Sequence, residues 1–492
     1  MRATKQDLQN QAGLKNFSRY DPAAFMPRCF YILLAAALPF AGAGCKHFQP
    51  KDISAQHQLE QLESRTLEDE GLRSFLRTNA PSVLEKVESK PWDLDSLTWA
   101  AIYFHPSMEV ARAQWQVAQS GVKTAGGRPN PTVTITPEYD FSASGVSPWL
   151  PAVNFDIPVE TAGKRSHRIT RAEHLAEAAR FNMAVTAWQI RSNLRNSLAS
   201  FAAVTRRTEI LQRQLEVQNQ IVKLLEGRVA AGAIAAIEVT SARVAATRAL
   251  SDLAEARRLS SEGRALIAEA IGIPLSALEK VRLRPDAQAL DLRQLTSSEL
   301  RRAALTSRAD LLAALAEYAA SQSTLQLEIA KQYPDIHIGT GYQWDQGDNK
   351  WALGITAEIP VLNRNQGPIA EAEARRAEAA ARFTALQAKV FAEIQRASAS
   401  LAAAREQITL LESARQAQQK ALASLQASLK AGAADQFDVA TGELELHASE
   451  LAVFDTNLKL QQAVAQLEDA LQQPFDALQV LQKKSQAKAN TP

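Results

Sequence analysis

The stretch Gly163-Lys164-Arg165-Ser166 follows a strand-like segment and has the residue types that end a phosphate-binding loop. In such a loop, backbone N–H groups and one lysine surround the phosphates of a nucleotide. The GxxxxGK pattern also needs a glycine five residues before Gly163, and that position holds Pro158. The spacing therefore excludes a nucleotide site, and the stretch must serve another purpose.

Histidines and other potentially catalytic residues form no recognisable site. The sequence has no GxSxG, CxxC, HExxH or Walker pattern and no Ser-His-Asp arrangement. Its seven histidines are scattered as His47, His57, His105, His167, His174, His337 and His447. His167 and His174 share a helix face, but they lie two turns apart, which is too far for one metal ion. We therefore expect no catalytic, cofactor-binding or metal-binding residues and no enzyme activity.

Composition and charge narrow the class of protein. The chain of 492 residues is 46% hydrophobic and 22% charged, which is typical of an ordered protein. Aromatic residues make up only 6% and alanine is abundant, which favours helices packed closely through small side chains. The net charge of +2 provides no large positive field, so we expect no nucleic-acid partner.

An apolar stretch near the N-terminus predicts export. It follows Arg28 and ends in small residues before Cys45, as a secretory signal peptide does. It is too short to be a membrane span and ends in a cleavage-like site. We expect translation to start at Met26 and Cys45 to be lipidated. Gly42 departs from the leucine usual in a lipobox, and plain cleavage near Ala43 is the alternative.

The body of the chain contains a tandem internal repeat, whose two copies are offset by close to 200 residues. The matched pairs are Ala231 with Ala431, Pro274 with Pro474, Phe155 with Ala357, Trp149 with Trp351, Pro131 with Pro334, and Leu97 with Leu300. Each unit predicts a first helix (about 106–127 and 308–332), two strands with a short polar loop, a very long helix, a glycine turn and a return helix. Six matches in the same order exceed chance.

The predicted strands alternate between apolar and polar residues, most clearly at 149–159 and 351–359. Their length suits a tilted transmembrane β-strand. Aromatic residues crowd the ends next to the loops, as in a membrane–water girdle: Tyr139, Phe141, Trp149, Tyr342, Trp344 and Trp351. A soluble hairpin is the alternative. Four strands cannot close a barrel, and lipid does not tolerate an open sheet edge, so several copies would have to share one barrel if these strands span a bilayer.

The long helices, about 164–230 and 367–430, contain no helix-breaking proline, and ~65 residues span ~100 Å. Apolar residues at alternating steps of three and four predict a coiled-coil seam. In the second helix they are Ile394, Ala397, Leu401, Ala404, Ile408 and Leu411, and in the first Leu194, Phe201, Val204 and Leu211. Return helices begin near Glu238 and Asp438, and the two hairpins should pack side by side.

Two such hairpins, each following two membrane strands behind an export signal, resemble the TolC-like outer membrane efflux protein family over about residues 92–475. The junctions Ile157–Ile169 ("IPVETAGKRSHRI") and Ile359–Ala374 ("IPVLNRNQGPIAEAEA") carry the resemblance most specifically. The tip segments Arg228–Val239 and Leu429–Val439 add to it. The junctions look most like the heavy-metal, CzcC-like branch.

The resemblance implies a mainly α fold with a small transmembrane β part. Three copies would form a twelve-stranded outer-membrane barrel, four strands per chain, continuous with a trimeric α-barrel tunnel through the periplasm of a Gram-negative bacterium. A periplasmic adaptor (membrane fusion) protein and an inner-membrane pump of the RND type would dock at the far end. The chain would be a passive conduit for small solutes such as heavy-metal cations or drugs.

In that family the functional residues lie at the ends of the tunnel. The chain is expected to reverse at the two hairpin tips, where a glycine can adopt a left-handed conformation. The tip residues are expected to contact the adaptor: Ala231, Gly232, Ala431 and Gly432. The acids Glu238, Asp435 and Asp438 would form a negative ring that gates the periplasmic entrance. The alternative is that Asp435 and Asp438 are helix caps and that Glu238 is a first-turn acid.

The hinge from barrel to tunnel is expected at the two junctions. Its residues are Pro158, Gly163, Lys164, Arg165, Pro360, Asn363 and Gly367. Lys164 and Arg165 are expected in the first turns of the helix, where they meet lipid headgroups or a neighbouring chain. The phosphate-loop likeness is thus replaced by a strand that ends at a proline, a polar turn with a glycine, and a long helix.

The expected domain boundaries follow the repeat. They are a leader and lipoprotein-type signal peptide at 1–45, an N-terminal periplasmic segment at 46–91, a first repeat at 92–274, an equatorial linker at 275–296, a second repeat at 297–475 and a polar tail at 476–492. Three other classes compete with the efflux channel. They are the outer membrane channel of a type I secretion system, a periplasmic adaptor, which has one hairpin, and a structural coiled coil.

Overall fold

The computed structural model describes residues 46–89, 91–284 and 302–474, except positions 143, 146 and 303. The expected signal peptide with Cys45, most of the linker and the polar tail lie outside these residues. The chain divides into two compact units, residues 1–61 and 62–492. The described part of the first unit holds most of helix α2 (Ala55–Glu63), none of whose residues is buried. The remaining elements belong to the second unit.

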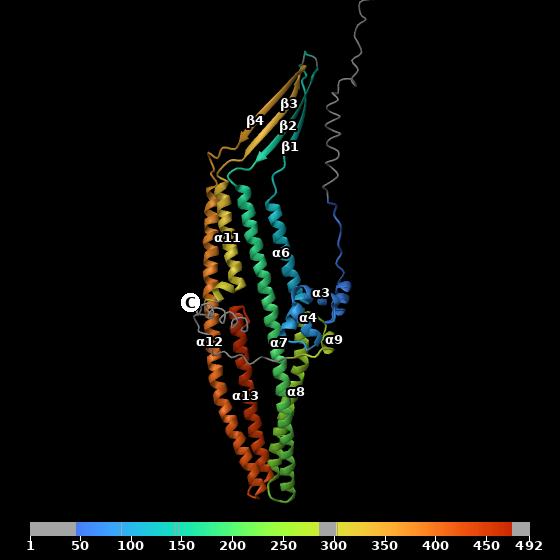
Figure 1. Ribbon diagram of the computed structural model, residues 1–492, viewed down its shortest axis with the longest axis vertical. Helices are drawn as coiled ribbons and strands as arrows, with labels where there is room; N and C mark the ends of the chain where they lie inside the picture. Colours follow the sequence, from blue (N-terminus) through green and yellow to red (C-terminus); the bar gives the residue numbers. More distant parts are fainter. Residues whose placement is uncertain are drawn as a thin grey trace, which may run out of the picture. The chain divides into compact units, whose positions relative to one another are not determined.

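Four strands form one antiparallel sheet in the order β1-β2-β3-β4 (Figure 1). They are β1 (Thr132–Tyr139), β2 (Trp149–Val159), β3 (Ile336–Asp345) and β4 (Asp348–Ala357). The pairing runs, for example, from Val133 to Phe155, to Thr340 and on to Leu353. Strands from both halves of the chain therefore share one sheet, and β1 and β4 are its edges.

Two long helical hairpins follow the strands, as the repeat predicts (Figure 1). The first is α7 (Lys164–Ala230) with α8 (Ala236–Ile271), and the second is α12 (Gln366–Lys430) with α13 (Gln436–Leu471). The return helices have only 36 residues each. The first helices of the repeats, α6 (Pro106–Ala125) and α11 (Ala309–Ala330), therefore cover the remaining length of α7 and α12. In addition, α13 packs against α7, which joins the hairpins.

The predicted seams are confirmed. In α12 the side chains of Ile394, Ala397 and Leu401 are buried, as are those of Leu194 and Phe201 in α7. They pack in two separate apolar clusters, one for each half of the chain. A tight helix–helix contact explains Gly263, because a Cβ there would meet the ring of Phe201 at 3.3 Å. The abundance of alanine and the low aromatic content fit this close packing.

Four short helices add a side cluster to the first repeat. They are α3 (Glu70–Asn79), α4 (Pro81–Ser89), α5 (Leu94–Phe104) and α9 (Leu275–Glu279). Asp69 and Asp93 cap α3 and α5 by accepting hydrogen bonds from the backbone. Leu72 and Leu97 are fully buried there with Ile271 from the end of α8. This cluster is the largest core of the described residues.

Positive φ angles mark the duplication in the backbone itself. Gly163 (φ 72°) corresponds to Asn365 (60°), Gly232 (70°) to Gly432 (74°), and Gly272 (85°) to Gln472 (50°). These residues lie at the start of the long helix, at the hairpin tip and at the end of the return helix. Both copies thus turn in the same three places, although the residue type differs in two of them.

Two predicted boundaries were wrong in detail. The strand expected at 351–359 ends at Ala357, because the last residue of β3 that can pair with it is Ile336. The polar loop expected between the second pair of strands is only a two-residue turn, Gln346-Gly347, between paired residues of β3 and β4. Both turn residues have positive φ, as the tightest hairpin turns require.

Within the described residues, no helix is long and apolar enough to cross a membrane.

Candidate functional sites at the junctions and hairpin tips

The first junction, from β2 to α7, is fastened by a buried lysine. Gly163 precedes the helix in a left-handed conformation, and Lys164 begins it with only 7% of its surface exposed. The Lys164 Nζ donates to Oδ1 of Asp335 at 2.7 Å and to the carbonyl oxygen of Tyr333 at 2.7 Å. The backbone N–H of Thr161 donates to the same Asp335 oxygen at 2.9 Å. The turn is therefore tied to the start of β3.

These partners shift the pKa of the Asp335 carboxyl. Partial burial raises the pKa of its carboxyl, but the Lys164 ammonium and the Thr161 N–H outweigh burial and hold the pKa below its ordinary value. Asp335 was missed in the sequence because 171 residues separate it from Lys164. The one signal in the sequence that could have identified Asp335 is its position directly after Pro334, the proline that marks the start of the strand.

Two arginines of α7 fasten the same junction to the end of α6. The Arg165 Nε donates to the carbonyl oxygen of Gly126 at 2.8 Å. Arg168 pairs with Glu160 and also donates to the carbonyl oxygen of Gly127 at 3.2 Å. Lys164 is too buried to meet lipid headgroups, because Asp335 and the carbonyl oxygen of Tyr333 hold its ammonium. For Arg165, which is partly exposed, a contact with lipid headgroups or a neighbouring chain stays a prediction.

The second junction, from β4 to α12, is built differently. Asn365 takes the left-handed position before α12 and donates through Nδ2 to the carbonyl oxygen of Glu328 at 2.7 Å. Asn363 accepts from the Asn365 N–H at 2.9 Å. Gly367 was expected in this turn, but it lies inside the first turn of α12, because an asparagine also tolerates positive φ. Pro360 is half-buried, but the apolar side chains of its neighbours Ile359, Val361 and Leu362 are exposed.

The aromatic residues gather in two groups on the sheet. Tyr139 contacts both Phe141 and Trp149 with ring centroids 4.9 Å apart, and Tyr342 contacts Trp351 at 5.0 Å. Trp344 lies two residues further along β3 and pairs with Asn349 in the register. All six lie near the ends of the strands that face the hairpin turns. Their role as a membrane girdle stays a prediction.

The hairpin tips share a backbone but differ in their caps. Ala231, Gly232, Ala431 and Gly432 are all exposed, and nothing lies within 4 Å of a Cβ built on either glycine. At the second tip, Asp435 caps α13 by accepting from the Asp438 N–H at 2.9 Å. Asp438 in turn accepts from the Asp435 N–H at 3.0 Å, which completes a capping box. Asp435 alone is the cap, and Asp438 lies in the first turn.

Arg228 forms an ion pair between the two tips, next to an apolar cluster in which Ala440 of α13 packs with Val217 and Val239 of the first hairpin. Arg228, at the end of α7, pairs with the carboxylate of Asp435 and lies over the ring of Phe437 at 4.8 Å from its centroid. Glu238 lies in the first turn of α8, exposed, and has no partner among the described residues. Of the three acids expected to gate the entrance, Glu238 is therefore the one whose carboxylate has neither a hydrogen bond nor an ion pair among the described residues.

Buried ion pairs at the middle of the hairpins join the two halves, and the sequence did not reveal them. Arg195 of α7 binds Glu468 at 2.5 Å and Asp469 at 2.7 Å on α13. A second buried arginine acts within the second half alone: Arg308, 5% exposed, binds Asp310 at 2.6 Å and the carbonyl oxygen of Ala470 at 2.6 Å. Burial lowers the pKa of Arg308, but Asp310 and Glu393 outweigh it, so the pKa lies above its ordinary value.

No group of three metal-ligating side chains that could hold an ion occurs among the described residues. The nearest approach to such a site on the sheet is a pair, His337 Nδ1 with Asp156 Oδ2 at 2.8 Å. The candidate functional sites are therefore the two junctions, the two hairpin tips and the open edges of the sheet.

Comparison with known proteins gives a consistent picture. The outer membrane efflux protein family matches residues 100–272 and 300–472, one match for each repeat. The cobalt-zinc-cadmium resistance protein CzcC of Cupriavidus metallidurans is 25% identical over 292 residues, which cover 59% of this chain and 68% of that protein. The chain is thus similar to CzcC, in agreement with the resemblance noted at the junctions.

Solved structures of outer membrane channels share the fold. VceC from Vibrio cholerae has a TM-score of 0.65 at 21% identity and covers 82% of this chain and 99% of its own. The CmeC channel of Campylobacter jejuni has a TM-score of 0.63 at 12% identity, covering 87% and 94%. The expected fold and its place in the outer membrane and periplasm are confirmed. The chain belongs to the outer membrane efflux protein family, whose members are channel proteins.

Proposed function

We propose that three copies of the chain form the outer membrane conduit of a tripartite efflux system. Each copy would contribute four strands to a twelve-stranded barrel and two hairpins to the tunnel below it. A periplasmic adaptor and an RND-type inner-membrane pump would deliver the cargo and the energy. The conduit itself would be passive and would have no enzyme activity.

The apolar face of the sheet carries this proposal. Along the pairing register, Val133, Phe155 and Leu353 lie on one face with Ile157 and Ile355, and their side chains are between 46% and 74% exposed. Such a continuous exposed apolar face is expected against lipid. The edges β1 and β4 have unpaired backbone groups, which only another strand can satisfy in a bilayer. A further copy provides those strands.

The test compares neighbours on opposite faces of one edge strand. Val133 lies on the apolar face of β1 and Thr134 on the other, and both are exposed. We expect Val133→Arg to abolish the heat-modifiable oligomer of the outer membrane fraction on unboiled gels, because arginine facing lipid costs about 2–4 kcal/mol near the bilayer centre. Thr134→Arg should leave it intact. Equal loss in both variants, or a soluble monomer for the unaltered chain, would contradict the shared barrel.

Heavy-metal cations are the proposed cargo. The support is CzcC, whose name describes cobalt, zinc and cadmium resistance. A strain that lacks this chain should become more sensitive to these three cations and recover when the chain is restored. A strain that becomes sensitive only to organic dyes or detergents would place the chain with a drug pump instead.

At the periplasmic entrance, the exposed tips would contact the adaptor and the acids would set the opening. A photo-crosslinker placed at Ala231 or Ala431 should capture the adaptor, whereas one at the exposed Arg248, about four helical turns along α8, should not. Glu238→Gln should reduce cation selectivity more than Asp438→Asn does, because the Asp438 carboxylate is occupied by the capping box. Unchanged selectivity in both variants would reject the gate.

The N-terminal proposals concern residues outside the described ranges. Cys45 would be lipidated after removal of the signal peptide, and the domain boundaries would follow the two repeats. Mass spectrometry of the mature protein decides the first point. A diacylglycerol-modified N-terminus at Cys45 supports it, and an unmodified peptide across Gly44 and Cys45 rejects it.

A further inference from the structure

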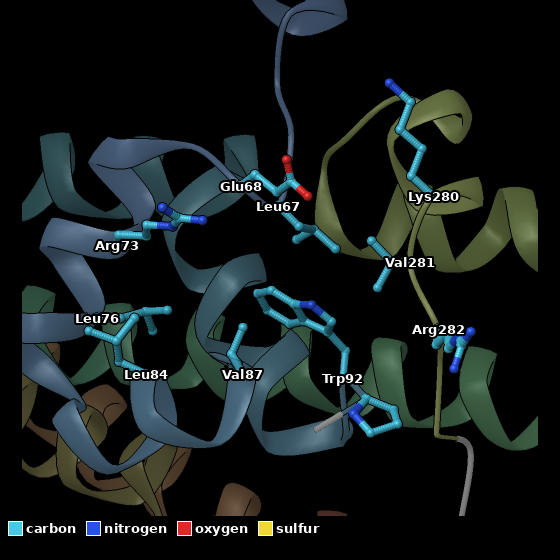
Figure 2. Close-up of a pocket in the computed structure, with 11 residues that line it drawn as sticks. Leu67, Glu68, Arg73, Leu76, Leu84, Val87, Trp92, Lys280, Val281 and Arg282 are labelled. Atoms are coloured by element: carbon cyan, nitrogen blue, oxygen red, sulfur yellow. The ribbon is translucent and has the colours of Figure 1, made fainter. Parts of the chain in front are cut away.

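A cavity of about 560 Å³ lies beside the short helices of the first repeat (Figure 2). Its walls come from α3, α4 and the segment after α9, with Leu76, Val87 and Val281 among them. Its size falls in the range of small-molecule sites, roughly 300–1,000 Å³. The cavity is far in sequence from the strands and from the hairpin tips, so the conduit function does not explain it.

Trp92 lies at the centre of the lining residues in Figure 2. Only 8% of its surface is exposed, and its indole N–H has no acceptor among the described residues but remains accessible to solvent from the cavity. The position of Trp92 is fixed by its backbone, whose N–H and carbonyl form a parallel bridge with the segment 282–284. The cavity therefore presents a donor that lacks an acceptor.

The charged residues around the cavity are mostly cations. Figure 2 shows Arg73, Lys280 and Arg282 at its periphery with one acid, Glu68. Lys280 and Arg282 have no side-chain partner among the described residues, and Arg73 has only a 3.9 Å contact with Glu70. Donors thus surround an apolar interior, and a ligand must supply both an acceptor with negative charge and an apolar body.

We propose that this cavity binds an amphiphilic anion, specifically a medium-chain aliphatic carboxylate. The alkyl chain would pack against the Trp92 ring, Leu76 and Val87. The carboxylate would accept from the indole N–H and pair with Arg282 or Arg73. Since the walls come from α3, α4 and the segment after α9, the bound ligand would fasten the segment before the first repeat to the linker that follows it.

Octanoate is a suitable probe, because it remains monomeric in water. The full-length protein in a non-ionic detergent should bind it saturably by isothermal titration calorimetry, with one site per chain and a detergent-only blank subtracted. Octanamide has the same chain without the charge, and acetate has the charge without the chain, so both should bind at least tenfold more weakly. Octanoate should also raise the apparent melting temperature of the protein, because a ligand stabilises the state that binds it.

Variants locate the site. Trp92→Phe keeps the ring and removes the donor, and Arg282→Gln removes an exposed cation that the core does not need, so each should weaken octanoate binding roughly tenfold. Glu68→Gln should strengthen it. Arg77→Gln, on the exposed face of α3 outside the cavity, is the matched control and should change nothing. Equal binding of octanamide, no binding above the blank, or unchanged affinity in both Trp92→Phe and Arg282→Gln would overturn the proposal.

Discussion

At the first junction a buried ammonium fastens the turn, whereas at the second junction three apolar side chains face outward. Lys164 is held by Asp335 and by the carbonyl of Tyr333. The corresponding segment of the second copy exposes Ile359, Val361 and Leu362 by 70% or more. Both junctions place a left-handed residue directly before the long helix, and the first has a further one, Ala162 (φ 53°).

Position in the sheet explains the difference. The first junction continues β2, which lies between β1 and β3, so the chain itself supplies neighbours on both sides. The second junction continues β4, an edge strand, whose outer side has no neighbour within the chain. The inner junction is therefore stabilised by hydrogen bonds and ion pairs within the chain. The outer junction exposes an apolar surface, which a neighbouring copy can cover.

At the hairpin tips it is the second copy, not the first, that has the polar contacts. The second tip has the capping box and the inter-hairpin pair of Asp435 with Arg228. In the first tip, Ala235 occupies the cap position of α8 and provides no side-chain hydrogen bond. The duplication therefore keeps the turns, while each copy stabilises a different end of its hairpin. Four substitutions test this contrast.

The largest effect is expected at Lys164. Lys164→Met removes the cation and leaves Asp335 without its main partner. Breaking a buried pair costs 3–5 kcal/mol, but Asp335 is 38% exposed, so solvent screening reduces the loss to about 2 kcal/mol. We expect a lower apparent melting temperature of the oligomer, measured by the loss of the heat-modifiable band.

Asp335 also gives this prediction a pH signature. Its folded pKa is lowered, so its stabilising contribution is present above the unfolded pKa of about 3.9 and is lost as the pH falls through the folded value. The difference between the unaltered protein and Lys164→Met should therefore shrink below about pH 4. The double variant Lys164→Met/Asp335→Asn should recover part of the loss. A constant difference down to pH 2 would show that Lys164 acts through packing alone.

The second effect tests whether the two left-handed positions are equivalent. Gly163→Ala places a Cβ at φ 72°, which costs about 1–2 kcal/mol, although its nearest neighbour, His167, is at an ordinary 3.6 Å. Gly163→Asn imitates Asn365 of the other copy and should cost less than half as much, because asparagine tolerates this conformation. Apparent melting temperatures of the two variants decide the point. If asparagine is as costly as alanine, the junctions differ in more than their side chains.

The third effect concerns the link between the tips. Arg228→Gln removes an exposed ion pair and a cation–π contact, together worth about 1 kcal/mol. We expect the channel in a planar bilayer to open more often, because Arg228 forms the one ion pair between the two tips among the described residues. Arg243→Gln is the control, since its pair with Glu226 lies within the first hairpin. Equal open fractions in both variants would remove Arg228 from the gate.

These contrasts show what the sequence alone could predict. Apolar periodicity correctly placed Ile394 and Leu401 in a seam, and the repeat correctly placed both tip glycines, because these features depend on neighbours close in sequence. The partner of Lys164 could not be predicted, because it lies 171 residues away and depends on strand pairing. Gly367 was taken for the turn residue, since an asparagine with positive φ leaves no distinct signal in one sequence.

The smallest effect is expected at the uncapped first tip. Ala235 has extended backbone angles (φ −77°, ψ 147°), and Glu238 lies three residues later, so Ala235→Asp completes a capping box like that of Asp435 and Asp438. The gain is expected at about 0.5 kcal/mol, the low end for caps, because the tip is exposed. Hydrogen exchange of the amides at 236–239 is the suitable measurement, since opening at a hairpin tip is local. Ala236→Asp, one residue later, cannot reach the same amides and is the control. Faster exchange in Ala235→Asp than in the unaltered chain would mean that the first tip is held open by something other than the missing cap.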